Sequence, residues 1–289
     1  MQTAVNTGTV SVPPFQLPYI IEGNGQPAIV VGSSKYYPRA FSKNLRNHLR
    51  FVFMDHRGMA PSPGQVDTSE FELDKIVDDI EILRQQLGLG RIMIIGHSGQ
   101  SYMALEYGKK YPENTSHVVM IGIAPNLGSA NAELAEKNYQ SLADSDRLAA
   151  EKENMRAIPE EKLSELPPGE AFITGYIRNA ARIWYDPRYD CTPLWEGVEI
   201  NMDMFEHVWG KLFAEIDITQ GLEDLQCPVF LALGRYDFIV APPSSWDPVK
   251  SKFKNLTLRI FEKSGHTPQF EEPELFDKDL LAWMNKYPS

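Results

Sequence analysis

Three polar residues, Ser98, Asp237 and His266, each lie just after a short apolar stretch of the sequence. These stretches are typical of strands buried on both faces, and they cover residues 92–95, 228–233 and 256–261. A serine hydroxyl is a weak nucleophile until a base removes its proton, and histidine acts as that base when a carboxylate fixes its tautomer. Because open parallel sheets build their sites at the carboxyl ends of their strands, we predict that the three side chains form a catalytic set for acyl transfer.

The predicted nucleophile, Ser98, stands between a strand and the start of a helical pattern, in the sequence Gly96-His97-Ser98-Gly99-Gln100. A sharp turn at this point leaves room only for small neighbours and pushes the serine hydroxyl out above the sheet. Gln100 occupies the place where the common G-x-S-x-G pattern has a glycine. Taken singly, each of these residues also suits an ordinary turn or loop, so the prediction depends on all three roles occurring in the order Ser, Asp, His.

Acyl transfer also requires hydrogen-bond donors for the oxyanion. The backbone N–H of Gly99, which follows the nucleophile, is one candidate, and the N–H of Ser33, in the loop after an early strand, is the second. The alternative for Gly32-Ser33-Ser34 is an ordinary turn. We interpret Asp55-His56-Arg57-Gly58 as a hydrogen-bonded turn that supports the site.

The remaining apolar patterns predict the elements that carry these residues. An antiparallel edge hairpin is expected over residues 9–21, and the alternation of strands and helices that follows is typical of a doubly wound, mostly parallel sheet. Further strands are predicted at 28–31, 50–54 and 117–123, and helices at 71–87, 102–111, 245–253 and 273–286.

The alternation stops after Pro125, and residues 126–226 carry helical patterns rich in aromatic residues and methionine. We interpret this stretch as an inserted helical cap, with residues 1–125 and 227–289 forming the core domain. Most of the aromatic residues are expected to hold the cap together, and some to contribute to a substrate pocket.

Composition limits the classes of function. The chain has 289 residues, 43% of them hydrophobic, and a net charge of -11, which disfavours nucleic acid as a partner because phosphate binding requires clustered Lys and Arg. The first thirty residues lack a leader pattern and no apolar run approaches a membrane span, so we expect no membrane association and a cytoplasmic location. We expect a small-molecule or short-peptide substrate, and neither a metal nor a cofactor.

Several motifs carry a resemblance to a known family. The chain resembles the α/β-hydrolase superfamily over nearly its whole length, and within it is most similar to the proline iminopeptidases. Asp55-His56-Arg57-Gly58 stands where that group has an Asp-Gln-Arg-Gly turn, and 265–269 with Glu272-Pro273 matches the superfamily's histidine loop. The segment 79–84 with Leu87-Gly88 is also similar. The group's His-Gly-Gly-Pro-Gly loop is replaced here by residues 31–35, Val-Gly-Ser-Ser-Lys.

The resemblance implies an α/β-hydrolase fold and further site residues. Trp195-Glu196-Gly197 and Glu206-His207 resemble the places where proline iminopeptidases keep glutamates that hold the substrate's terminal ammonium. A cation removed from water requires a countercharge, so Glu196 and Glu206, with Trp195, are candidate substrate-binding residues. Solvated residues of the cap are the alternative for both glutamates.

These observations predict a serine hydrolase that works through an acyl-enzyme. The first expectation is a proline iminopeptidase-like aminopeptidase that acts on small peptides or amides. A carboxylesterase or lactonase acting on a small ester is the alternative. A hydrolase-fold binding protein that turns nothing over is a third hypothesis, disfavoured because a binder has no use for a base and an orienting acid.

Overall fold

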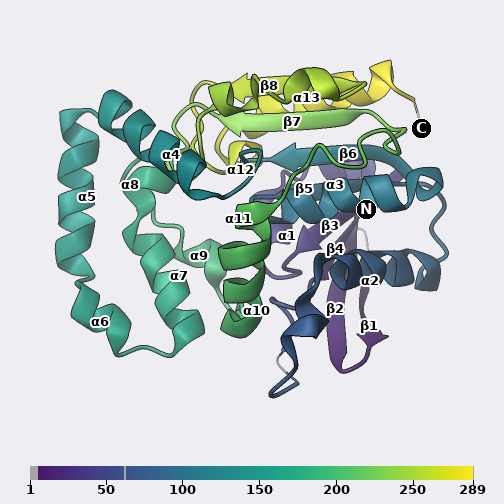
Figure 1. Ribbon diagram of the computed structural model, residues 1–289, viewed down its shortest axis with the longest axis horizontal. Coiled ribbons are helices and arrows are strands. Elements are labelled where there is room, and N and C mark those ends of the chain that lie inside the picture. Colours follow the sequence, from purple (N-terminus) through teal and green to yellow (C-terminus); the bar gives the residue numbers. More distant parts are fainter. Residues whose placement is uncertain (1–5, 62, 289) are drawn as a thin grey trace.

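An eight-stranded sheet forms the centre of the computed structural model, which describes residues 6–61 and 63–288 (Figure 1). The strand order is β1-β2-β4-β3-β5-β6-β7-β8. β1 and β2 form an antiparallel hairpin at one edge, β2 also pairs antiparallel with β4, and every pairing from β4 to β8 is parallel. The strands are β1 (Asn6–Val12), β2 (Phe15–Glu22), β3 (Gln26–Gly32), β4 (Leu49–Asp55), β5 (Ile92–His97), β6 (Thr115–Ile121), β7 (Val229–Gly234) and β8 (Leu256–Phe261).

Alternate residues of the central strands supply two separate cores. In β5, Ile92 and Ile94 belong to one buried cluster, while Met93 and Ile95 belong to the other. Successive side chains of a strand point to opposite faces, so an uninterrupted apolar run is what a strand covered on both faces requires. The predicted mostly parallel, doubly wound sheet is therefore confirmed.

Helices cover both faces of this sheet. Residues of α2 (Leu73–Gln86) and α3 (Gln100–Lys110) pack into the first cluster, and residues of α1 (Tyr37–Ala40) and α13 (Pro273–Lys286) pack into the second. The short helix α12 (Pro268–Glu271) precedes α13 and follows the loop that carries His266. The loops that carry Ser98, Asp237 and His266 follow parallel strands and therefore leave the sheet at the same edge, between the two helical layers.

A helical segment lies between β6 and β7. It contains α4 (Ser129–Leu142), α5 (Ser145–Ala157), α6 (Glu160–Ser164), α7 (Pro168–Arg178), α8 (Ala180–Ile183), α9 (Thr192–Trp195), α10 (Met202–His207) and α11 (Phe213–Glu215), with one π-helical turn over Val208–Leu212. Figure 1 shows α4 to α7 extending away from the sheet, whereas α10 and α11 lie near its edge. The fold thus has the predicted helical insertion, and its treatment as a separate cap domain over 126–226 stays a prediction.

One predicted helix is wrong. Residues 245–253 form no α-helix, and two short 3-10 turns, Pro243–Trp246 and Lys250–Lys252, stand in its place. Pro248, inside this stretch, explains the difference, because proline lacks the N–H that an α-helix requires in its interior. Within residues 6–61 and 63–288, no helix combines the length and the apolar character required to cross a membrane.

Candidate active site

Ser98 occupies a strained turn between β5 and α3. Its φ is 57°, in the left-handed region that residues with a side chain rarely adopt. A Cβ at Gly96 would lie 2.2 Å from the Gln100 carbonyl oxygen, and a Cβ at Gly99 would lie 2.5 Å from Trp209 Nε1. The two glycines are therefore required by the closeness of the following helix and of the helical insertion.

Asp237 and His266 form a buried pair at the ends of neighbouring strands. Asp237 follows β7, His266 follows β8, and Asp237 Oδ2 lies 2.7 Å from His266 Nδ1. The side chains are 3% and 1% exposed. A carboxylate in this position accepts a hydrogen bond from the Nδ1–H group, so the ring proton stays on Nδ1 and Nε2 of His266 is free to act as a base.

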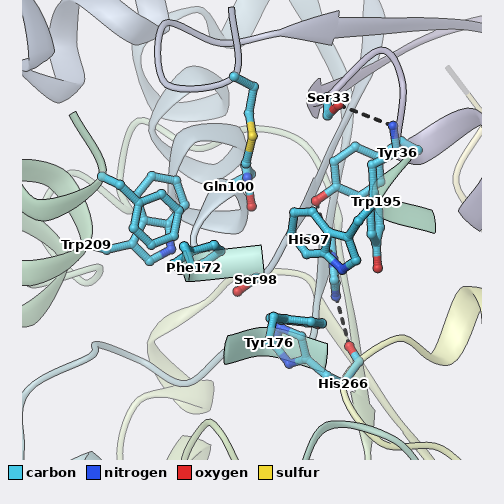
Figure 2. Close-up of a pocket in the computed structure, with 13 residues that line it drawn as sticks. Ser33, Tyr36, His97, Ser98, Gln100, Phe172, Tyr176, Trp195, Trp209 and His266 are labelled. Carbon is cyan, nitrogen blue, oxygen red and sulfur yellow. Dashed lines mark hydrogen bonds between the residues drawn. The ribbon is translucent and has the colours of Figure 1, made fainter. Parts of the chain in front are cut away.

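Ser98 and His266 line one pocket, which we call the inner pocket (Figure 2). No hydrogen bond joins the Ser98 hydroxyl to the His266 ring. Such bonds are often long in an unliganded site and tighten when substrate binds, so the two residues are placed for a nucleophile and its base. The structure thus brings together the three residues that the sequence placed at strand ends.

Buried polar contacts hold the loop of His266. The His97 ring has its Nε2 2.9 Å from the His266 carbonyl oxygen and its Nδ1 3.2 Å from the Tyr37 hydroxyl. Because a carbonyl only accepts, His97 Nε2 carries the proton and Nδ1 accepts from Tyr37. Burial, followed by the nearby His266, lowers the pKa of His97 well below its ordinary value, so this ring is neutral.

Glu271 holds the same loop from the other side. One carboxylate oxygen accepts hydrogen bonds from the N–H groups of Gly265 and Thr267, at 3.0 and 3.1 Å. The other accepts a hydrogen bond from the N–H of Tyr185, at 2.7 Å. Burial raises the pKa of Glu271 to about 7. Sequence reasoning missed Glu271 and His97 as supports of His266, although His97 is next to Ser98 in its motif and Glu271 lies between the two parts of the histidine-loop motif.

The predicted oxyanion loop follows β3. Ser33 lines the inner pocket, and its hydroxyl accepts the N–H groups of Lys35 and Tyr36, both at 3.2 Å. The Ser34 N–H donates to Asp55 Oδ1 at 2.5 Å, and burial raises the pKa of Asp55 to about 6. The turn that begins at Asp55 therefore fixes the backbone next to Ser33.

Arg57 anchors that turn to α2. Its guanidinium binds Asp79 through two bonds of 2.6 and 2.8 Å and also contacts Glu70 at 2.7 Å. At the other end of the turn, the Gly58 carbonyl accepts the N–H of Asn201 at 2.8 Å. The turn thus links the loop of Ser33, the helix α2 and the helical insertion, in agreement with the supporting role we inferred for it.

Aromatic rings form most of the inner pocket, whose cavity volume is about 60 Å³. A larger groove of about 600 Å³ also reaches Ser98 and shares part of this wall. Four rings of the helical insertion line both spaces: Phe172, Tyr176, Phe205 and Trp209. The rings of Phe205 and Trp209 stack 4.2 Å apart with an interplanar angle of 8°.

The candidate substrate-binding residues of the insertion, Trp195, Glu196 and Glu206, do not all face the inner pocket. Trp195 lines the inner pocket, whereas Glu196 and Glu206 are exposed and do not line it. Among the described residues that line the inner pocket there is no carboxylate. Phe205 and Glu206 are successive residues of α10 and point about 100° apart, so Glu206 cannot share the direction of Phe205, whereas Glu196 is the first residue after the end of α9.

Comparison with known proteins agrees with this architecture. Residues 19–273 match the family model described as alpha/beta hydrolase fold, and the chain therefore belongs to that family. The AB hydrolase superfamily protein YclE of Bacillus subtilis is 38% identical over 272 residues, which cover 94% of this chain and 96% of YclE.

More distant relatives include proline iminopeptidases. The proline iminopeptidase of Heyndrickxia coagulans is 26% identical over 87% of this chain and 88% of its own. The crystal structure of the proline iminopeptidase of Mycobacterium smegmatis superposes with a TM-score of 0.71 over 98% of both chains, at 13% identity. That structural likeness shows the shared fold.

Proposed function

We propose that this chain is a serine hydrolase that cleaves small neutral esters through an acyl-enzyme. Ser98 attacks the ester carbonyl while His266 Nε2 takes the serine proton, and Asp237 stabilises the imidazolium that forms. The N–H groups of Ser33 and Gly99 stabilise the oxyanion. His266 then gives the proton to the leaving alcohol, and a water molecule releases the acid by the same steps in reverse order.

The composition of the pocket wall supports an ester over an N-terminal amine. Binding a free ammonium group removes a cation from water, which is costly without a countercharge. The described lining of the inner pocket has rings, hydroxyls, an amide, a thioether and imidazoles but no carboxylate, and this is the observation that carries the choice. Lactones present the same reacting group and belong to the same proposal.

Aminopeptidase activity is the second candidate, because proline iminopeptidases are among the relatives. In that case, Glu196 or Glu206 would have to turn from the surface toward the pocket when substrate binds. A protein that only binds ligands is disfavoured by the buried pair of Asp237 and His266, which has a use in proton transfer and none in simple binding.

Covalent labelling tests the nucleophile. A fluorophosphonate probe should modify the wild-type protein, and Ser98→Ala should remain unlabelled, because the probe reacts with an activated serine. Ser101→Ala is the matched control, since the Ser101 hydroxyl donates to the Gly96 carbonyl at 3.0 Å and lies outside the pocket lining. Equal labelling of wild type and Ser98→Ala would remove the hydrolase proposal.

A substrate comparison tests the choice of ester. We expect the wild-type protein to hydrolyse 4-nitrophenyl butanoate faster than proline 4-nitroanilide, measured as kcat/KM, and Glu196→Gln and Glu206→Gln to change the ester rate less than twofold. Cleavage of the proline arylamide that falls at least tenfold in either glutamate variant would instead support the aminopeptidase.

A further inference from the structure

Gln100 is a buried polar residue in the wall of the inner pocket. It is the first residue of α3, it is 4% exposed, and it stands where related motifs have a glycine. An amide has an acceptor end and a donor end, and both require partners when the side chain leaves water. The hydrogen-bond partners of the Gln100 amide therefore indicate which chemical groups the pocket can bind.

The protonation of the His56 ring determines which atom of the Gln100 amide lies next to it. The N–H of Gly58 donates to His56 Nδ1 at 3.0 Å, so Nδ1 carries a lone pair and no proton. Burial lowers the pKa of His56 to about 3, and the ring is neutral at physiological pH. Its single ring proton is therefore on Nε2, which faces Gln100 as a donor.

The orientation of the Gln100 amide follows from this donor. Gln100 Nε2 lies 3.3 Å from His56 Nε2, an arrangement that sets two N–H donors against each other. Rotating the amide by 180° exchanges its ends, so that Oε1 accepts from His56 and the NH₂ group takes the other position. Figure 2 shows that other end directed into the pocket, over Ser98. No residue of the described chain forms a hydrogen bond with it.

We propose that Gln100 determines specificity by donating an amide N–H to an oxygen of the substrate. The site then prefers esters that carry a hydrogen-bond acceptor in the group seated in the inner pocket. An all-carbon group of the same size would leave a buried donor without a partner, which disfavours its transition state. This inference rests on the proposed ester hydrolysis and names its substrate class.

Two matched pairs of esters test the proposal. In 4-nitrophenyl methoxyacetate and 4-nitrophenyl butanoate, an ether oxygen replaces one methylene of the acyl group. In 2-methoxyethyl acetate and butyl acetate, the same replacement lies in the alcohol. For each pair, the ratio of kcat/KM values is compared between wild type and variant, so that the intrinsic reactivity of each ester cancels.

Two variants of Gln100 change the donor. Gln100→Met keeps the length of the side chain without an N–H, and Gln100→Glu keeps an acceptor for His56 while presenting a carboxylate oxygen to the pocket. We expect both variants to reduce the preference for the ether ester by about 3- to 10-fold in one of the two pairs, with Glu reducing it at least as far as Met. Gln226→Met, at an exposed position, is the control and should leave both ratios unchanged.

The outcomes separate this inference from the proposed function. If the wild-type protein hydrolyses none of the four esters, the esterase proposal fails. If it hydrolyses them and both ratios stay within twofold in both variants, or all four rates fall equally, Gln100 does not determine specificity. The tautomer of His56 gives a readout independent of activity: ¹⁵N NMR should show a protonated Nε2, and a protonated Nδ1 would overturn the assignment of the amide.

Discussion

The site around Ser98 has two sides, one formed by the loop of His266 and the other by the helical insertion, and different kinds of contact hold them. On the histidine side, Asp237 holds the His266 ring, His97 donates to the His266 carbonyl, and Glu271 accepts hydrogen bonds from the backbone on either side of His266. On the side of the helical insertion, aromatic rings such as Phe205 and Trp209 form the wall by stacking. Hydrogen bonds fix the direction of a side chain, whereas ring contacts mainly fill space. We therefore expect the histidine side to govern the rate of the chemical step and the ring wall of the insertion to govern which substrates bind.

Breaking the Asp237–His266 bond should give the largest effect. Asp237→Asn keeps the shape of the residue but removes the acceptor that selects the Nδ1–H tautomer, so kcat for ester hydrolysis should fall roughly 10⁴-fold. KM should change little, because Asp237 does not line the inner pocket. Steady-state kinetics with 4-nitrophenyl butanoate measures both quantities.

Asp277→Asn is the control for this prediction. Asp277 is also a buried carboxylate, 4% exposed, but it accepts hydrogen bonds from Ser42 and Asn44 and does not line the inner pocket. We expect it to lower the melting temperature while kcat changes far less. Similar losses of kcat in the two variants would show that Asp237 acts only through stability.

The ring wall should give a smaller effect of a different kind. Phe205→Ala removes one partner of the stacked pair and widens the inner pocket, so KM for a short ester should rise about tenfold through lost apolar contact, with a smaller change in kcat. Leu142→Ala, on the exposed part of α4, is the control and should leave KM unchanged. A fall in kcat comparable to that of Asp237→Asn would erase the distinction between the two sides.

The same distinction explains what the sequence could predict. Ser98, Asp237 and His266 each follow their own strand, so local patterns reveal them and the sheet brings them to one edge. The wall depends instead on the direction in which each residue of the insertion faces. The sequence contains a signal for this, since Phe205 and Trp209 are four residues apart and Glu206 lies on another face of the helix.

Local sequence patterns do not predict contacts between segments that are far apart in the chain. The approach of Gln100 to His56 joins residues 44 positions apart, and the bond from Tyr185 to Glu271 spans 86. Neither pairing follows from a local period, because each depends on how two loops meet in space. For the same reason the sequence shows only that Gln100 departs from the G-x-S-x-G pattern, whereas the structure places its side chain in the pocket wall.

The smallest expected effect concerns the support of the histidine loop by Glu271. The raised pKa means that the folded protein holds this proton more tightly than the unfolded chain. The stability from this group is therefore fully present below about pH 4.5 and is lost as pH rises through about 7. Because Glu271→Gln cannot titrate, the stability of the wild type relative to this variant should fall between pH 5 and pH 8, by on the order of 1 kcal/mol given the partial exposure of the residue.

Thermal or urea unfolding of both proteins at several pH values measures this difference. Glu274→Gln, at an exposed position of α13, is the control and should show a difference that is constant with pH. A constant difference for Glu271→Gln as well would mean that the three N–H bonds to its carboxylate offset the cost of burial. Glu271 would then remain ionised throughout, and the histidine side of Ser98 would be held by a permanent charge, a still sharper contrast with the uncharged ring wall.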